Sequence, residues 1–497
     1  MEKDPEKKIE NEIVPTRRCP SFRLSMALLM FLGSLTVYMN RVNMSMALVC
    51  MTEDRNTTEE YVPPEFTWNA SLRGFIMSSF YIGYILTQIP TGLVIHKVNA
   101  KWVQFGGMII VALTSFLSPV AARGGWGYLV ALQIIKGLAN GSYYPCNQCV
   151  ISEWSPPQER ALTTALSMTG SSLGNVLTFA LSGYLCDHGF AGGWPSIFYS
   201  FGIAAAIWLV MYALFAYETP AKHPWISEKE RDYIEFSLAS QVPPKRVAVP
   251  WKSVLTSLEV WAIIIADFGY SWIWFTALTS LPTYFSDVLN FEITENGLFN
   301  SLPHILYLLV AFFSSYMVDF LSTKNVPLTK MRKVVVSLEL LLSAGFILGV
   351  SFVDDTTTVV ALLTFSVGFL GISRAGHFVN MVEVAPRFAG PVMSVANTVS
   401  NIAGIIAPII TAEMTPNKTQ EEWVYVFILA ACLNFAAFIF YAIFGSAEVQ
   451  PWARVEDDEI LPEKDINSQE ILNMPYVNNG FTFDNLEKEN IEVSQKF

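Results

Sequence analysis

Residues 24–51 of the chain read LSMALLMFLGSLTVYMNRVNMSMALVCM. About 20 mostly apolar residues in an α-helix are enough to cross the roughly 30 Å hydrocarbon core of a bilayer. This run is long enough to do so, and Arg41 is the single charged residue in it. The stretch therefore predicts a transmembrane helix that carries a cation inside the membrane.

Runs of the same kind recur along the 497 residues. Of all residues, 52% are hydrophobic and only 15% are charged, which is far from the composition of a soluble protein. The predicted spans lie near 24–51, 72–95, 103–122, 126–150, 161–185, 195–217, 260–287, 295–320, 334–352, 358–381, 391–413 and 423–446. The sequence thus predicts an all-α membrane protein with twelve transmembrane helices.

The longest polar break falls between the sixth and seventh spans. The loops after the fourth and tenth spans also resemble each other, as Ser155-Pro-Pro-Gln-Glu-Arg160 and Ala385-Pro-Arg-Phe-Ala-Gly390. Matching features six spans apart are typical of a protein built from two repeated halves. We therefore expect two six-helix pseudo-repeat bundles. The expected parts are a cytoplasmic N-terminal tail (1–23), a first bundle (24–217), a central cytoplasmic loop (218–259), a second bundle (260–446) and an acidic, disordered cytoplasmic tail (447–497).

Basic residues collect in the loops that follow even-numbered spans, for example Lys97 and Arg160. Short basic loops stay on the cytoplasmic side, so both termini are expected in the cytoplasm. Three acceptor sequons for glycosylation, at Asn56, Asn69 and Asn417, fall in odd-numbered loops, which this orientation puts outside.

The net charge of −12 comes mostly from the tail, where twelve acidic residues face four basic ones between Ala447 and Phe497. Outside short loops there is no basic stripe, so nucleic acid is not an expected partner. The sequence offers no hydrolase triad, metal cluster or phosphate-binding glycine loop, so we expect neither an enzyme nor a bound cofactor or metal.

Six cysteines are scattered and mostly inside apolar spans, which predicts no disulfide framework. Cys146 and Cys149 have the spacing of a redox or zinc pair, but no second pair or histidine lies near them in the sequence. We interpret them as small buried thiols.

Ionisable groups inside a bilayer are costly, which makes each one a functional candidate. Arg41 has a planar guanidinium that suits a carboxylate or a phosphate, although it could also extend toward the outer surface. Lys136 shares one helix face with Gln133, Gly137 and Asn140, and could assist anion binding or pair with a carboxylate.

The remaining candidates lie in the second half of the chain. Asp267 could hold Na⁺ or a proton, or serve as a structural hydrogen-bond acceptor. His304 follows Pro303, which frees a backbone carbonyl and could open a polar pocket. Glu339 is interpreted as a structural pairing partner. Arg374 and His377 could line the path or anchor their helix near its cytoplasmic end.

Several stretches in the same order resemble the anion:cation symporter family of the major facilitator superfamily, which includes sialin, vesicular glutamate carriers and phosphate and organic-anion transporters. They are Arg41-Val-Asn-Met-Ser-Met-Ala47, Tyr84-Ile-Leu-Thr-Gln-Ile-Pro90, Trp154-Ser-Pro-Pro-Gln-Glu-Arg160, Glu295-Asn-Gly-Leu-Phe-Asn-Ser-Leu-Pro303 and Val384-Ala-Pro-Arg387. The resemblance implies an alternating-access carrier coupled to Na⁺ or H⁺, with Arg41 in the substrate path. Gln133, Asn140 and Tyr270 stand where the glutamate carriers have ionisable residues, which implies a substrate other than glutamate.

The sequence and this resemblance together predict a secondary active transporter of small anions. The leading expectation is Na⁺-coupled symport of inorganic phosphate or an organic anion by a monomer in the plasma membrane. A proton-coupled, sialin-like exporter of organic acids in endolysosomes is one alternative, and a non-transporting receptor or scaffold is another. The expected substrate-binding residues are Arg41, Asn43, Gln133, Lys136, Asn140, Tyr270 and His304, and the expected ion-coupling residues are Asp267, Arg374 and His377.

Overall fold

The structure is a computed structural model that describes residues 21–56, 61–95, 98–239, 249–324 and 326–454. The predicted tails, 1–23 and 447–497, lie mostly outside the described residues. The described residues up to Val449 form one compact unit.

Each of the twelve predicted spans is helical. The first half contains α2 (Phe22–Thr52), α3 (Ala70–Ile95), α4 (Ala100–Gly124), α5 (Trp126–Gly141), α6 (Tyr143–Trp154), α7 (Pro157–His188) and α8 (Trp194–Phe215). The second half contains α11 (Leu258–Thr279), α12 (Leu281–Asp287), α13 (Ile293–Ser322), α14 (Leu328–Gly349), α15 (Thr356–Phe369), α16 (His377–Val384), α17 (Ala389–Met414) and α18 (Gln420–Phe444). A short hairpin of β1 (Arg55–Asn56) and β2 (Tyr61–Val62) follows α2.

Among the described residues, nine helical segments are long and apolar enough to cross a membrane. The segments that fall short are α3, the α5–α6 pair and α7, which pack among the others. They carry polar side chains that are buried in the protein, such as Gln133 and Asn175. Such residues lower the average apolarity of a span without facing lipid.

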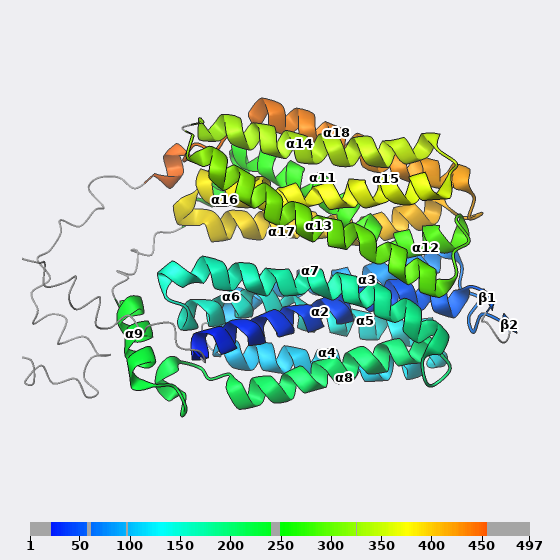
Figure 1. Cartoon of the computed structure of the whole chain (residues 1–497), viewed down its shortest axis with the longest axis horizontal. Helices are drawn as coiled ribbons and strands as arrows, with labels where there is room; N and C mark the ends of the chain where they lie inside the picture. Colours follow the sequence, from blue (N-terminus) through cyan, green and yellow to red (C-terminus); the bar gives the residue numbers. More distant parts are fainter. Residues whose placement is uncertain (1–20, 57–60, 96–97, 240–248, 325, 455–497) are drawn as a thin grey trace, which may run out of the picture. The chain divides into compact units, whose positions relative to one another are not determined.

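The two sets of helices form separate layers, with α2–α8 below and α11–α18 above in Figure 1. The layers meet where α7 packs on α13 and α3 packs on α17. At the first of these contacts Gly183 faces Gly297, and a Cβ atom on Gly183 would lie only 3.0 Å from the Cα atom of Gly297. Only glycine lets the two backbones approach this closely.

Three of the spans are interrupted. The fourth breaks between α5 and α6 at Ser142, and the seventh breaks between α11 and α12 at Ser280. The tenth contains a 3-10 helix, η3 (Leu370–Ala375), between α15 and α16. A 3-10 stretch within a longer helix often marks a functional hinge, and broken helices often line transport sites.

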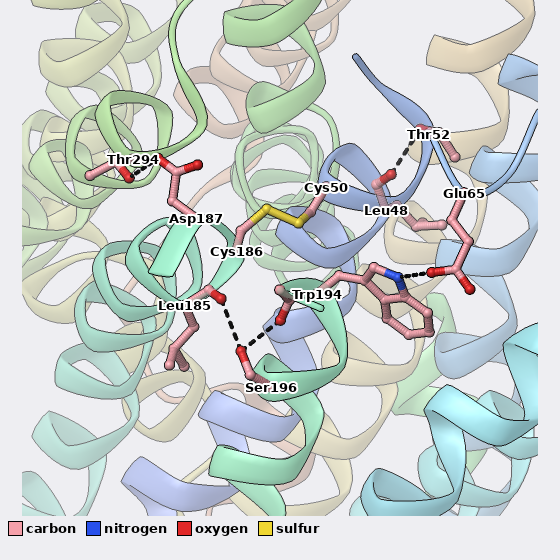
Figure 2. Close-up of a disulfide and its surroundings, with 11 residues drawn as sticks. Leu48, Cys50, Thr52, Glu65, Leu185, Cys186, Asp187, Trp194, Ser196 and Thr294 are labelled. Atoms are coloured by element: carbon pink, nitrogen blue, oxygen red, sulfur yellow. Dashed lines mark hydrogen bonds between the residues drawn. A yellow bond between two sulfur atoms is a disulfide. The ribbon is translucent and has the colours of Figure 1, made fainter. Parts of the chain in front are cut away.

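The expectation of no disulfide is wrong, because Cys50 near the end of α2 is bonded to Cys186 near the end of α7 (Figure 2). Their Cα atoms are 6.2 Å apart although 136 positions separate them in sequence. Each cysteine lies at the edge of an apolar run, so only the packing of α2 against α7 reveals the pair. Cys146 and Cys149 are free thiols, and Cys146 is buried as predicted, whereas Cys149 is half-buried.

The central segment, expected to be a loop, is partly helical. It contains a 3-10 turn η1 (Pro220–Lys222), α9 (Glu228–Ala239) and α10 (Trp251–Thr256). The carboxylate of Glu230 in α9 accepts hydrogen bonds from Ser21 Oγ at 2.6 Å and from the backbone amides of Phe22 and Arg23 at 3.2 Å. These bonds fasten α9 to the start of α2, at the end of the helices opposite the β hairpin (Figure 1).

Candidate functional site

Arg41 lies in α2 with only 8% of its surface exposed. Its guanidinium carbon is 4.7 to 5.7 Å from the ring centres of Tyr38, Phe80, Tyr81, Tyr84 and Phe275. Within the described residues its hydrogen bond goes to Asn401, and no carboxylate pairs with it. Aromatic faces attract a guanidinium but do not neutralise it. A buried cation without a counter-ion is a ready receptor for an anion.

A small pocket opens beside Arg41. Polar lining comes from Ser45 of the same helix, Tyr81 of α3, Gln133 of α5 and Thr279 of α11. The pocket therefore draws on both halves of the chain and offers hydroxyl and amide groups next to one cation. Such a mixture can orient an anion's oxygen atoms.

The predicted polar stripe of α5 is buried: Gln133, Lys136 and Asn140 are each at most 2% exposed. Gln133 Oε1, Lys136 Nζ and both polar atoms of the Asn140 amide have no hydrogen-bond partner among the described residues. Asn43 in α2 is also buried, and both polar atoms of its amide have no hydrogen-bond partner among the described residues. Because buried polar groups are normally paired, these atoms indicate space for water or a solute in the first half.

The polar side chains of this α5 face do not all lie beside Arg41. Gln133 reaches the pocket, whereas the Lys136 ammonium lies 5.7 Å from the ring centre of Phe198 in α8. Gly137, which follows Lys136, sits directly against α3, where a Cβ atom would lie 2.0 Å from the carbonyl oxygen of Phe80. That close approach holds α3, with Phe80 and Tyr81, beside Arg41.

Tyr270 and His304 lie in the second half, on either side of Trp274. The Tyr270 ring stacks 5.9 Å from Trp274, and His304 meets the same indole edge-on at 5.1 Å. His304 also stacks on Phe179 of α7 at 5.3 Å, so it fills the contact between the halves. These two residues line an aromatic wall and are not among the residues that line the pocket of Arg41.

Arg374 is carried by η3, the interruption of the tenth span. Its Nε donates a hydrogen bond to Tyr307 Oη at 3.0 Å, and the Tyr307 and Tyr270 hydroxyls are 3.3 Å apart. Tyr38 interacts electrostatically with both Arg374 and Arg41. Two guanidinium groups, one from each half, therefore interact with the same tyrosine.

Asp267 and His377 come together in the second half, and Glu339 joins them. His377 Nε2 lies 3.4 Å from Asp267 Oδ1, and His377 Nδ1 lies 3.2 Å from Glu339 Oε2. Ser400 donates a short hydrogen bond to the other oxygen of Asp267. The pairing role predicted for Glu339 has a partner here in His377.

Sequence reasoning did not select Tyr38, Phe80, Tyr81 or Asn401. Tyr38 and Tyr81 are ordinary residues of apolar spans when read alone. Tyr38, Phe80 and Tyr81 each lie about one turn from a residue of a motif quoted above, whereas Asn401 does not. Only the fold shows that all four lie close to Arg41.

The residues with predicted sequons lie at the end of the helices that carries the β hairpin and the disulfide. The side chains of Asn69 and Asn417 are exposed. Asn69 Oδ1 accepts a hydrogen bond from the amide of Leu72, and Asn417 Nδ2 donates one to Glu422. The side chain of Asn56 and the two threonines of its sequon lie outside the described residues.

Four charged residues join the two halves at this same end. Lys418 Nζ is 2.6 Å from Glu53 and 3.1 Å from Asp287, and Arg73 is 2.5 Å from Glu53 and 3.9 Å from Asp287. We call Glu53, Arg73, Asp287 and Lys418 the outer ion cluster, because the charges of the loops predict that this end faces outside. Glu53 and Arg73 belong to the first half, and Asp287 and Lys418 to the second, so the cluster closes the boundary between the halves.

Comparisons with known proteins identify the family. The profile of the Major Facilitator Superfamily matches residues 30–408. A Drosophila ananassae protein named "Putative inorganic phosphate cotransporter" is 37% identical over 91% of this chain and 98% of its own length. Human sialin is 35% identical over 88% of this chain and 91% of its own. Human vesicular glutamate transporter 2 is 34% identical over 88% of this chain and 76% of its own.

Solved structures agree on the fold. An inward-facing, occupied bacterial homolog of the human lysosomal transporter Spinster superposes with a TM-score of 0.66 at 12% identity, over 85% of this chain and 96% of its own. A D-xylose-proton symporter gives a TM-score of 0.65 at 16% identity, over 86% of this chain and 99% of its own. The chain is therefore a multi-pass membrane transporter, not an enzyme, and belongs to the major facilitator superfamily, in the family that includes sialin and the vesicular glutamate transporters.

Proposed function

We propose that this protein carries a small anion through the membrane by alternating access, with Arg41 as the main contact for the anion. The observation that supports this most directly is the buried guanidinium of Arg41, which has aromatic neighbours and no ionic partner among the described residues. It lies beside a pocket to which both halves contribute. A site shared by two halves is accessible from either side when the halves rock.

Inorganic phosphate or an organic anion is the proposed substrate class, with Na⁺ as the coupling ion. The relative named as a phosphate cotransporter and the neutral side chains of Gln133, Asn140 and Tyr270 support it. The test is uptake of labelled phosphate and labelled urate into proteoliposomes, with and without a Na⁺ gradient. We expect uptake of one of them to rise with inward Na⁺. Equal uptake in both conditions for every anion would remove Na⁺ from the proposal.

A second candidate is proton-coupled export of an organic acid from an acidic compartment. It is favoured by the convergence of Asp267, His377 and Glu339 in the second half. Sialin, one of the similar proteins, gives the substrate class. Transport driven by a pH gradient in the absence of Na⁺ would distinguish this candidate from the first.

We also propose that both termini face the cytoplasm and that a monomer in the plasma membrane performs transport. The disulfide of Cys50 and Cys186 lies at the end of the helices opposite α9, and disulfides persist on the non-cytoplasmic side of membranes. Treating intact cells with a membrane-impermeant reductant, followed by thiol labelling of the denatured protein, tests this orientation. Release of the two thiols would support it, and protection in intact but not in permeabilised cells would contradict it.

A further inference from the structure

Three titratable side chains from three different spans meet inside the second half. His377 is the first residue of α16, Asp267 lies in the middle of α11, and Glu339 lies in α14. All three are at most 3% exposed. The backbone makes room for them at Gly376, where a Cβ atom would lie 3.2 Å from Glu339 Oε2.

The charges of these three groups do not cancel when each has its usual protonation state at neutral pH. Two ionised carboxylates around a neutral imidazole would carry a charge of −2 in a buried site, which is very costly. A proton on the imidazole leaves −1, and a second proton on a carboxylate leaves zero. Groups that interact this closely share protons as a unit. The site therefore has a strong electrostatic reason to bind protons.

A metal ion fits the geometry less well than a proton does. The imidazole ring lies between the two carboxylates, with its nitrogens 3.4 and 3.2 Å from their oxygens. Hard cations such as Na⁺ need several oxygen ligands that converge on one point. Here the ring occupies the position where such a point would be, and Asp267's second oxygen is bonded to Ser400.

The remaining oxygen of Glu339 supports the same reading. Glu339 Oε1 is buried and has no hydrogen-bond partner among the described residues. An ionised carboxylate oxygen in that position would lose its solvation without compensation, so Glu339 is a natural place for the second proton.

A chain of contacts links these residues to the two arginines. The Tyr270 ring meets the His377 ring at 5.4 Å, and the Tyr270 hydroxyl is 3.3 Å from the hydroxyl of Tyr307, which accepts the bond from Arg374. His377 and Arg374 also flank the junction between η3 and α16. A change of charge at His377 can therefore reach Arg374, which, like Arg41, interacts electrostatically with Tyr38.

Other titratable groups face the three residues from the neighbouring helices. Tyr270 of α11, Tyr307 of α13 and Arg374 of η3 form one connected group of them. In addition, Tyr441 of α18 interacts electrostatically with Glu339, and also with Arg332 and Glu383, which pair with each other at 2.7 Å. The Arg332–Glu383 pair is internally neutral, so it does not supply the missing positive charge.

We propose that Asp267, His377 and Glu339 form a proton-binding site of the second half, which takes up a proton from one side of the membrane together with the anion and releases it to the other side. The proton comes from water on the uptake side, binds to a carboxylate oxygen and returns to water, and no electrons are transferred. This inference rests on the second candidate function above, proton-coupled transport of an anion, and it takes the place of Na⁺ coupling in the first.

The test uses the purified full-length protein in proteoliposomes without Na⁺. The outside pH is held constant, so that labelled phosphate or urate keeps one ionisation state there, and the inside is made more alkaline. We expect the wild-type protein to accumulate the anion under this gradient. Glu339→Gln should lose the accumulation but retain exchange of labelled for unlabelled anion at equal pH, because exchange needs no net movement of protons.

Asp267→Asn provides a second variant, since an amide oxygen can still accept the bond from Ser400. Asp319→Asn is the matched control, because Asp319 is an exposed carboxylate of α13 in the same half, and it should retain both activities. Exchange also reports folding for every variant. If Glu339→Gln loses exchange too, Asp267→Asn alone decides.

Two results would overturn the inference. One is wild-type exchange with no response to the pH gradient, and the other is accumulation by both Glu339→Gln and Asp267→Asn at the wild-type level. The absence of both exchange and accumulation in the wild-type protein, for all anions tried, would instead overturn the proposed function.

Discussion

The guanidinium of Arg41 in α2 donates a hydrogen bond to the side-chain oxygen of Asn401 in α17, over 3.4 Å. These helices belong to different halves of the chain, so the principal cation of the first half touches the second half directly. An anion that binds Arg41 must displace or rearrange this contact. Substrate binding and the packing of the two halves are therefore linked at a single residue.

Replacing Arg41 by lysine should weaken anion binding while preserving the charge. Lysine lacks the planar fork that can hold two oxygens, and it stacks less well on the surrounding rings. Loss of one hydrogen bond to a charged group costs about 1.5–3 kcal/mol, which corresponds to a rise in KM of roughly tenfold or more. Initial uptake rates against anion concentration measure it. Arg123→Lys, at an exposed pair with Glu65, is the control and should leave KM unchanged.

Lys418→Gln should favour opening of the outer side. The substitution leaves Glu53 and Asp287 with only Arg73 between them, and an ion pair of this partly exposed kind is worth up to about 1 kcal/mol, or roughly a fivefold change in a two-state ratio. A cysteine introduced at Ser45 in the pocket reports the opening through its labelling rate by an impermeant reagent added outside.

The matched control for this experiment is Lys324→Gln, an exposed lysine of the second half that is outside the outer ion cluster. It should leave labelling of the Ser45 position unchanged. If the cysteine at position 45 is labelled equally fast with and without the Lys418→Gln substitution, the outer ion cluster does not hold the halves together.

Removing the disulfide should destabilise the first half. Cys50 and Cys186 close a loop with a sequence separation of 136, and native disulfides commonly contribute about 2–4 kcal/mol. The Cys50→Ser/Cys186→Ser variant should therefore melt at a lower temperature in detergent, and a reductant should lower the melting temperature of the wild-type protein but not of this variant. Cys432→Ser, at a free and exposed cysteine, should have no effect.

The junction of α9 with α2 should depend on pH. Burial raises the pKa of Glu230, but the hydrogen bonds from Ser21, Phe22 and Arg23 outweigh it and hold the pKa below its usual value of 4.5. A lowered pKa in the folded state stabilises the junction above pH 4.5, and this contribution is lost as the pH falls through the folded-state pKa. The protection factors of the α9 amides, which correct for the intrinsic pH dependence of hydrogen exchange, should therefore be high at neutral pH and fall in acid.

Glu230→Gln should show fast exchange of α9 already at neutral pH, because a neutral amide cannot replace the charged acceptor of several bonds. Glu235→Gln, on the exposed side of α9, serves as the comparison. Equal protection in the Glu230 variant and the wild-type protein would show that other contacts hold α9.

The helices could be predicted from the sequence because a membrane requires long apolar runs, and each predicted span is helical in the structure. Arg41 could be selected for the same reason, since a charge is conspicuous in such a run. The interruptions were not predictable from apolarity. Gly141 and Pro145 flank Ser142, and Gly368, Gly371 and Gly376 lie in or beside the 3-10 segment that carries Arg374, but hydropathy alone counts both regions as parts of continuous spans.

Contacts between residues far apart in the sequence could not be predicted either. Cys50 and Cys186 are each unremarkable alone, and only the packing of α2 on α7 brings them together. Asp267, Glu339 and His377 come from the seventh, ninth and tenth spans, and their common site depends on how those spans pack. Single residues could be proposed because burial has a local cost, whereas their partners depend on the tertiary fold.

The central claim is that Arg41 binds the transported anion. The most direct measurement compares wild-type protein and Arg41→Ala in proteoliposomes for uptake of labelled phosphate and labelled urate, with reconstitution matched by protein content and melting temperature. We predict saturable uptake of at least one anion by the wild-type protein and none above protein-free vesicles by Arg41→Ala. Saturable uptake by Arg41→Ala with the wild-type KM would contradict the account.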